Sequence, residues 1–171
     1  AHFANLGFDT MMFDTSEQAL SKSIAMMKKL KPTPFASPSV SGLIKTSTYD
    51  DLTAISGCDF IIESIVENLE IKKKLFKQIS PYVNDNAILV TNTSGLSIQK
   101  IAESAPDSLR SRIFGVHFFN PPRYLPLVEL IRTSYSDESL LIKTEGFITS
   151  ALGKEVVYAK DSPAFVANRL G

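Results

Sequence analysis

Cysteine and tryptophan are scarce in this 171-residue chain, which has a single cysteine, Cys58, and no tryptophan. One cysteine excludes an intrachain disulfide and a cysteine-based metal cluster, and it favours a reducing compartment. An excess of charge of one sign is also missing, because 18 lysines and arginines balance 18 aspartates and glutamates. No global basic field therefore favours nucleic acid, and no apolar run reaches the roughly 20 residues of a transmembrane helix. We expect no nucleic-acid partner, no membrane span and no metal site.

The composition that remains is ordinary for a globular protein, with 44% hydrophobic and 21% charged residues. Short apolar runs alternate with amphipathic segments along the chain. Strands are predicted at residues 8–13, 44–47, 58–62, 87–90, 113–119, 125–132 and 155–159. Helices are predicted at residues 1–6, 15–30, 68–79, 97–104 and 136–153, and another begins within 161–171. This alternation predicts one α/β domain with a largely parallel sheet and flanking helices.

The helices carry specific expectations about their ends. Gly7 is expected just after the first helix, and Gly153 after the last one. Thr15 is predicted to cap the second helix in a capping box with Gln18, and Asn68 is predicted to cap the third. The helix predicted at residues 136–153 is expected to begin at Ser136 or at Asp137.

The helical spacing also predicts which side chains face the core. In the third helix Lys72 to Lys74 and Lys77 are expected on a solvated face, with Glu70 paired to Lys74. The inward positions are predicted to be Ile71, Leu75 and Ile79 in the third helix, and Leu140, Thr144, Phe147 and Ala151 in the last.

A histidine and a glutamate stand twelve residues apart in two predicted strands. His117 ends an apolar strand, and Glu129 lies between aliphatic residues in the next one. Each side chain is costly to bury, and a mutual hydrogen bond would offset both costs. A histidine held by a carboxylate is typical of a general base. The alternatives are a core histidine with a structural hydrogen bond and a glutamate at the surface end of its strand.

Polar residues follow several of the predicted strands. They are Asp14, then Glu63 with Ser64 and Glu67, then Asn92 with Thr93, Ser94 and Gly95, and then His117 with Asn120. In α/β sheets, ligands bind beyond the carboxyl ends of the strands. These residues therefore predict one shared site. Ser94 and Asn92 have a simpler alternative, which is a turn before the next helix.

The longer motifs around these residues resemble a known family. They are residues 61–68 with Lys72, residues 92–96, residues 117–121 with Glu129, and residues 161–169. Together they resemble the NAD-binding domain of L-3-hydroxyacyl-CoA dehydrogenases, over essentially the whole chain. Residues 120–124 resemble most closely the dehydrogenase part of larger fatty-acid β-oxidation proteins. The resemblance implies a Rossmann-type fold, NAD as cofactor, and oxidation of L-3-hydroxyacyl-CoA to 3-oxoacyl-CoA.

The resemblance also implies roles for individual residues. His117 would be the general base that removes the proton of the 3-hydroxyl group, and Glu129 would orient it. Ser94 and Asn168 would hydrogen-bond the substrate oxygen; a cap of the following helix is the alternative for Asn168. The positions implied for cofactor contacts are Asp14, Glu67, Lys72, Asn92, Ser94 and Asn120.

Asp14 indicates which dinucleotide is preferred. In a dinucleotide-binding fold, a carboxylate at the end of the second strand accepts hydrogen bonds from ribose hydroxyls and repels a 2′-phosphate. The residues after it are Thr15 and Ser16, with no arginine to accommodate that phosphate. We therefore expect NAD rather than NADP. The alternative for Asp14 is a cap of the helix that follows.

The chain departs from the family pattern at both ends. The family's first strand and Gly-x-Gly-x-x-Gly turn, and its C-terminal helical domain for substrate and dimerisation, have no counterpart in residues 1–171. We therefore expect a partial NAD-binding domain with an unpaired gap in the sheet. Its parent would bind acyl-CoA in a cytoplasm, as a homo-oligomer or fused to an enoyl-CoA hydratase; a mitochondrial or peroxisomal origin is the alternative. The functional alternatives are a related 3-hydroxy acid dehydrogenase and an inactive folded module.

Overall fold

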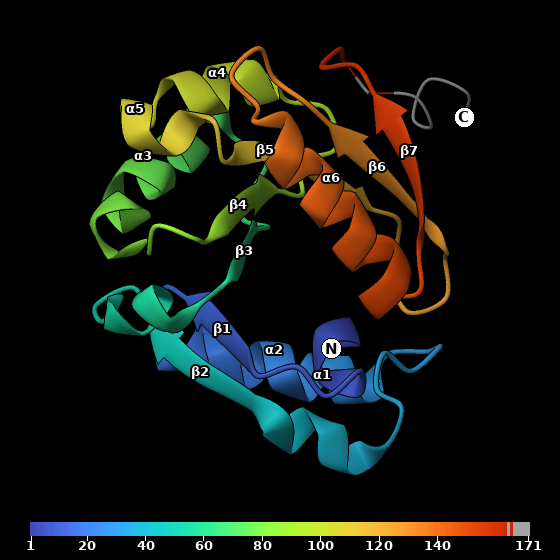
Figure 1. The fold of residues 1–171 in the computed structure, drawn as a ribbon. Coiled ribbons are helices and arrows are strands. Elements are labelled where there is room, and N and C mark those ends of the chain that lie inside the picture. The colour runs from blue at the N-terminus through green and yellow to red at the C-terminus, as the bar shows by residue number, and fades with distance from the viewer. Residues whose placement is uncertain (164, 166–171) are drawn as a thin grey trace. The chain divides into compact units, whose positions relative to one another are not determined.

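A computed structural model describes residues 1–163 and residue 165 (Figure 1). The chain divides into two compact units. The first unit comprises Ala1–Ala54 with Phe119–Pro126, and the second comprises Ile55–Phe118 with the residues from Leu127 onward. The helix expected within residues 161–171 falls largely outside the described residues.

The first unit is a small α/β piece built on two parallel strands. Its elements are α1 (His2–Asn5), β1 (Thr10–Asp14), α2 (Glu17–Lys29), the 3-10 helix η1 (Pro38–Leu43) and β2 (Ile44–Thr48). Strands β1 and β2 pair in parallel from Thr10↔Ile44 to Asp14↔Thr48. Gly7 adopts φ +84° after α1, which is the left-handed geometry expected of a residue that ends a helix.

The cap of α2 differs from the prediction by one residue. The hydroxyl of Ser16 accepts the hydrogen bond from the Ala19 backbone N–H, at 3.2 Å. Thr15 is engaged elsewhere, since its backbone N–H and its hydroxyl both donate to Asp14 Oδ1. The predicted cap at Thr15 was therefore wrong, because Asp14 binds that residue and Ser16 is the next residue with a suitable oxygen.

The second unit is a five-stranded sheet with helices around it. Its strands are β3 (Phe60–Glu63), β4 (Ile88–Thr91), β5 (Ile113–Phe118), β6 (Leu127–Ile131) and β7 (Glu155–Ala159), in that order across the sheet. Only the β5–β6 pair is antiparallel among the ladders of this sheet. The expected α/β architecture with a largely parallel sheet is confirmed, and β1–β2 forms a separate sheet.

Helices flank the five-stranded sheet, as expected. They are α3 (Leu69–Ile79), α4 (Ile98–Glu103), α5 (Asp107–Arg110) and α6 (Glu138–Gly146), which continues as a π turn over Phe147–Ala151. In Figure 1, α3, α4 and α5 gather along one side of the sheet and α6 crosses in front of it. Short 3-10 helices at Thr53–Gly57 (η2) and Ser80–Tyr82 (η3) complete the described elements. The sequence did not predict α5, η2 or η3, because each has less than two turns of periodic pattern.

The buried face of α3 is rotated from the predicted one. Lys72, Phe76 and Ile79 are buried, whereas Ile71 is 46% exposed. Glu70 pairs with Lys73 at 2.9 Å and not with Lys74. The prediction placed Lys72 in solvent because lysine is rarely buried without a partner. Here Lys72 has a partner, the buried carboxylate of Glu63, so the side of the helix that carries Lys72 faces inward.

The inward face of α6 also differs from the prediction. Thr144 is buried as expected, but Leu141 and Ile148 are the buried apolar residues beside it. Phe147 lies partly exposed and packs against Phe60 of β3, with ring centroids 5.3 Å apart. The π turn widens the end of the helix, so a regular 3.6-residue period does not describe its face.

Gly115 sets how closely α4 approaches the sheet. A Cβ atom at this position would lie 2.2 Å from Ile98 Cδ1 and 3.1 Å from Ile131 Cβ. Ile98 begins α4, and Ile131 pairs with Gly115 across the β5–β6 ladder. His117 follows Gly115 by two residues and therefore points to the same face of β5. Because Gly115 has no side chain, the start of α4 packs directly against the face of the sheet that carries His117.

We predict that Gly115→Ala destabilises the protein by about 1–3 kcal/mol, because the methyl group overpacks a core in which Ile98 is fully buried. Urea unfolding followed by circular dichroism measures the change. Gly57→Ala is the matched control, since a Cβ there meets nothing within 4 Å. Equal stability of the two variants would contradict the packing argument.

Candidate active site

His117 and Glu129 face each other across the antiparallel β5–β6 ladder. They are direct register partners, and His117 Nδ1 lies 2.7 Å from Glu129 Oε2. The pair is buried, with 6% of His117 and none of Glu129 exposed. Because a carboxylate only accepts, the Nδ1–H group donates and Nε2 keeps the lone pair that can take a proton. The mutual hydrogen bond expected from the sequence is therefore present.

Asn92 connects the carboxyl ends of three neighbouring strands. Its backbone N–H donates to Glu63 O at the end of β3, at 2.8 Å. Its side-chain oxygen accepts from the Phe118 N–H at 2.9 Å, directly after His117 in β5. Its side-chain nitrogen reaches the Ser64 hydroxyl at 3.4 Å. Asn92 is thus engaged through both polar atoms, and it fixes the end of β5 beside the histidine.

A buried ion pair joins the end of β3 to the first turns of α3. Lys72 Nζ lies 2.6 Å from Glu63 Oε1, and the two side chains are each 1% exposed. The same ammonium lies 3.3 Å from Glu67 Oε2 and 3.3 Å from the carbonyl oxygen of Ile65. Glu63 Oε2 accepts from the Thr91 hydroxyl of β4. The Lys72 ammonium is therefore bound by groups of the protein itself.

Glu67 holds the loop that carries Ser94. Its Oε1 atom accepts from the Ser94 N–H at 2.9 Å and from the Thr93 hydroxyl. Burial alone would raise the pKa of Glu67, but these hydrogen bonds and the nearby Lys72 ammonium outweigh it, so the pKa lies below its ordinary value. Glu67 therefore stays ionised at neutral pH, and its side chain remains 44% exposed.

We predict that Lys72→Met destabilises the protein by about 3–5 kcal/mol, because it leaves Glu63 charged and buried without its partner. Lys74→Met, at an exposed position of the same helix, should cost far less. The double variant Lys72→Met with Glu63→Gln should recover part of the loss. Chemical unfolding measures all three, and equal losses in the two single variants would contradict the role of the ion pair.

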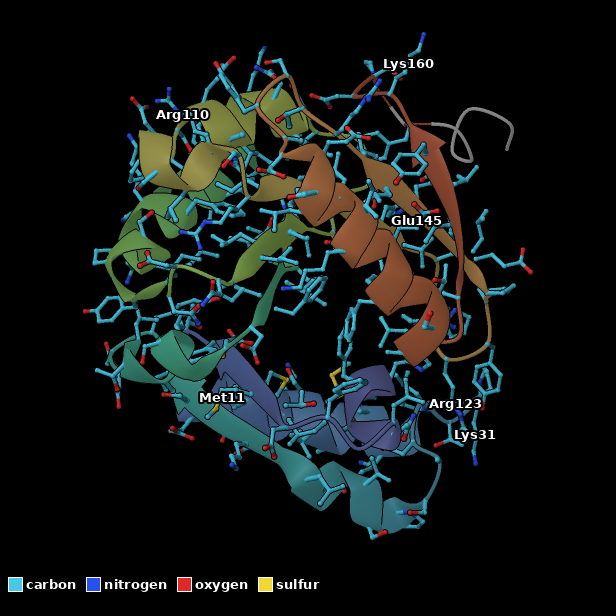
Figure 2. All side chains as sticks on the ribbon, in the orientation of Figure 1. Met11, Lys31, Arg110, Arg123, Glu145 and Lys160 are labelled. Atoms are coloured by element: carbon cyan, nitrogen blue, oxygen red, sulfur yellow. The ribbon has the colours of Figure 1, made fainter. Side chains whose placement is uncertain are left out.

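Asp14 and Asn120 belong to the first unit. Asp14 ends β1, and its Oδ1 atom binds Thr15 while Oδ2 has no hydrogen-bond partner among the described residues. Asn120 is exposed on the segment Phe119–Pro126. That segment is fastened to the loop after α2 by Arg123, whose Nη1 atom donates to Thr33 O at 3.0 Å; Figure 2 shows Arg123 beside Lys31 of that loop.

The second unit thus brings together six of the predicted site residues, whereas Asp14 and Asn120 lie in the first unit. The six are His117, Glu129, Asn92, Ser94, Glu67 and Lys72. Asn168 falls outside the described residues. The sequence analysis missed Thr91, whose hydroxyl donates to Glu63, and it placed Thr93 in the shared site without the bond to Glu67 that the structure shows. The available signal was that Thr91 and Thr93 are two residues apart, which places them on the same face at the end of β4.

Known proteins share this arrangement of strands. The sequence profile of the family "3-hydroxyacyl-CoA dehydrogenase, NAD binding domain" matches residues 1–162. The chain belongs to this family. The human mitochondrial hydroxyacyl-coenzyme A dehydrogenase is 33% identical over 180 residues, which cover 98% of this chain and 56% of that protein. A Rickettsia felis protein described as a fatty acid oxidation complex trifunctional enzyme is 42% identical over 146 residues, 85% of this chain and 20% of that protein.

A solved member of the 3-hydroxyacyl-CoA dehydrogenase group has the same fold. The (S)-3-hydroxybutyryl-CoA dehydrogenase of Ralstonia eutropha superposes with a TM-score of 0.84 at 32% identity. The match covers 99% of this chain and 61% of that one. The chain therefore spans between a fifth and three fifths of the length of these relatives. Within the described residues, no helix is long and apolar enough to cross a membrane.

Proposed function

We propose that this protein catalyses the NAD-dependent oxidation of L-3-hydroxyacyl-CoA to 3-oxoacyl-CoA, with His117 as the general base. The observation that carries the proposal is the buried 2.7 Å hydrogen bond between His117 and Glu129 in a member of this family. The reaction removes a hydride from C3 and a proton from the 3-hydroxyl group. A base must take that proton as the carbonyl group forms.

The side chains of the second unit divide this work. Glu129 holds the Nδ1–H group, so His117 presents Nε2 to the hydroxyl proton, and the buried carboxylate stabilises the imidazolium that results. Asn92 fixes the backbone next to His117 through the Phe118 N–H. Ser94, exposed on a loop held by Glu67, would donate to a substrate oxygen, and Asn168 would assist it.

The residues of the chain fit NAD, which when bound supplies the acceptor for the hydride. Asp14 has one carboxylate oxygen without a partner in the described part of the chain, as acceptance from ribose hydroxyls requires. Glu67 is ionised and partly exposed, so it can also accept from hydroxyl groups. Lys72 does not fit a direct contact, because its ammonium is 1% exposed and already bound. We therefore assign Lys72 to the support of Glu67, with Asn120 as a contact on the nicotinamide side.

We also propose that residues 1–171 are part of an NAD-binding domain that works within a longer protein. The length of the relatives supports this, and one relative combines several activities in a fatty acid oxidation complex. Fusion to an enoyl-CoA hydratase, or a homo-oligomeric parent, would follow from the same relationship. We place the parent in a bacterial cytoplasm, in keeping with its single cysteine and its bacterial relatives.

The test is NADH-linked turnover of acetoacetyl-CoA and 3-hydroxybutyryl-CoA, with this chain and a version extended at both ends. We predict that His117→Gln lowers kcat by about 10²–10⁴-fold while NADH affinity stays nearly unchanged, because only the proton acceptor is lost. His2→Gln, the other histidine, is the control. A large loss of NADH binding in His117→Gln would make the histidine structural. A folded, inactive extended protein would overturn the dehydrogenase proposal.

We predict that the protein binds NADH more tightly than NADPH, and that Asp14→Asn narrows this preference. The carboxylate repels a 2′-phosphate and accepts from the ribose hydroxyls, whereas the amide lacks the charge. Fluorescence titration with both nucleotides measures the ratio of Kd values. Asp9→Asn, in the loop before the same strand, is the control. If the ratio of Kd values is unchanged in Asp14→Asn, Asp14 does not contact the cofactor and only binds Thr15 before α2.

A further inference from the structure

The segment after β7 returns to α4, the helix that packs over Gly115. The carboxylate of Asp161 accepts from the Ile98 N–H at 3.0 Å, the Gln99 N–H at 2.8 Å and the Ser97 hydroxyl at 3.1 Å. The first N–H groups of a helix lack partners within the helix itself. Here the acceptor for these N–H groups is Asp161, which is more than sixty residues away along the chain. Asp161 therefore fastens its own segment to the start of α4.

This segment brings Phe165 beside His117. Its side chain is 1% exposed and packs in one cluster with Ile98, Ile131 and Ala159. Its ring centroid lies 6.0 Å from that of His117, with an angle of 57° between the planes. The aromatic ring therefore packs beside the imidazole and belongs to the core cluster that includes Ile98 of α4.

The backbone of Phe165 shows that this placement is imposed by its surroundings. Its φ is +46°, in the left-handed region that a bulky side chain rarely adopts. The Phe165 N–H closes a turn onto Ser162 O at 3.0 Å. Such a conformation persists only where neighbouring contacts require it, and it occurs often at functional sites. The neighbouring contacts here are the anchored Asp161, the core cluster of Ile98, Ile131 and Ala159, and the ring of His117.

We propose that Asp161 and Phe165 are positioning residues for His117. The inference deepens the proposed function, since it rests on His117 as the base. The hydrogen bond to Glu129 holds the Nδ1 edge of the imidazole. The ring of Phe165 packs beside the imidazole and restricts its rotation about the side-chain bonds. Asp161 keeps Phe165 in place, and neither residue transfers a proton.

The first test observes the ring of His117 directly, by NMR of the 171-residue chain. Asp161→Ala and Phe165→Ala should broaden or double the His117 ring signals, because the imidazole gains a second orientation. Asp137→Ala is the matched control, since Asp137 caps α6 with hydrogen bonds of 2.8 and 3.2 Å to Ser139 and Leu140. Lys160→Ala, an exposed neighbour of Asp161 that points outward in Figure 2, is a second control. Both controls should keep one set of ring signals.

The second test uses the form of the protein in which turnover depends on His117. We expect kcat to fall about tenfold in Asp161→Ala and Phe165→Ala, because a misplaced base reacts less often. KM and NADH affinity should change less than about twofold, since neither residue touches substrate or cofactor in the proposal. Asp161→Asn, which keeps one acceptor oxygen, should recover part of kcat.

The outcomes separate the two proposals. Single His117 signals and unchanged kcat in both variants, with a loss of stability like that of Asp137→Ala, would reduce Asp161 and Phe165 to structural residues. If turnover does not depend on His117, the proposed function fails, but the NMR spectra still decide whether the two residues hold the ring. Circular dichroism checks that each variant is folded, and Phe165→Leu replaces Phe165→Ala if the latter unfolds.

Discussion

Polar groups buried in the five-stranded sheet must find partners inside the protein, and this constraint organises the second unit. Glu63, Lys72, His117 and Glu129 are all buried, and each would be costly to bury alone. The structure joins them into two pairs, one between β3 and α3 and one across β5 and β6. The positions of Asn92 and Glu67, and through them the loop of Ser94, follow from these pairs.

The sequence predicted most strands and the longer helices, because apolar periodicity and capping residues are local signals. Asn68 caps α3 and Asp137 caps α6, as such signals indicated. The errors arose where a side-chain contact outside the helical pattern decided the outcome. Lys72 faces inward because it binds Glu63, which lies nine residues earlier at the end of β3. Thr15 fails as a cap because its hydroxyl and amide bind Asp14.

The candidate site was predictable in its chemistry and less so in its supports. The cost of burying His117 and Glu129 pointed to their hydrogen bond, and the register of β5 and β6 explains their spacing. Nothing local reveals that Asp161 accepts from the first N–H groups of α4, because the two are joined only by the fold. The same holds for the contact between Phe165 and His117, because these two residues are 48 positions apart along the chain.

The position of β6 within the sheet has a consequence for motion. Strand β6 is bonded on both sides, to β5 and to β7, and Glu129 has a ladder partner in each. Central strands exchange their amide hydrogens only in the rarest and largest openings of a protein, whereas loops open often. The carboxylate therefore sits in the slowest-opening part of its unit, while Ser94 rides on a loop. Under the proposed function, the His117–Glu129 pair would stay fixed while the residues around it adjust to a ligand.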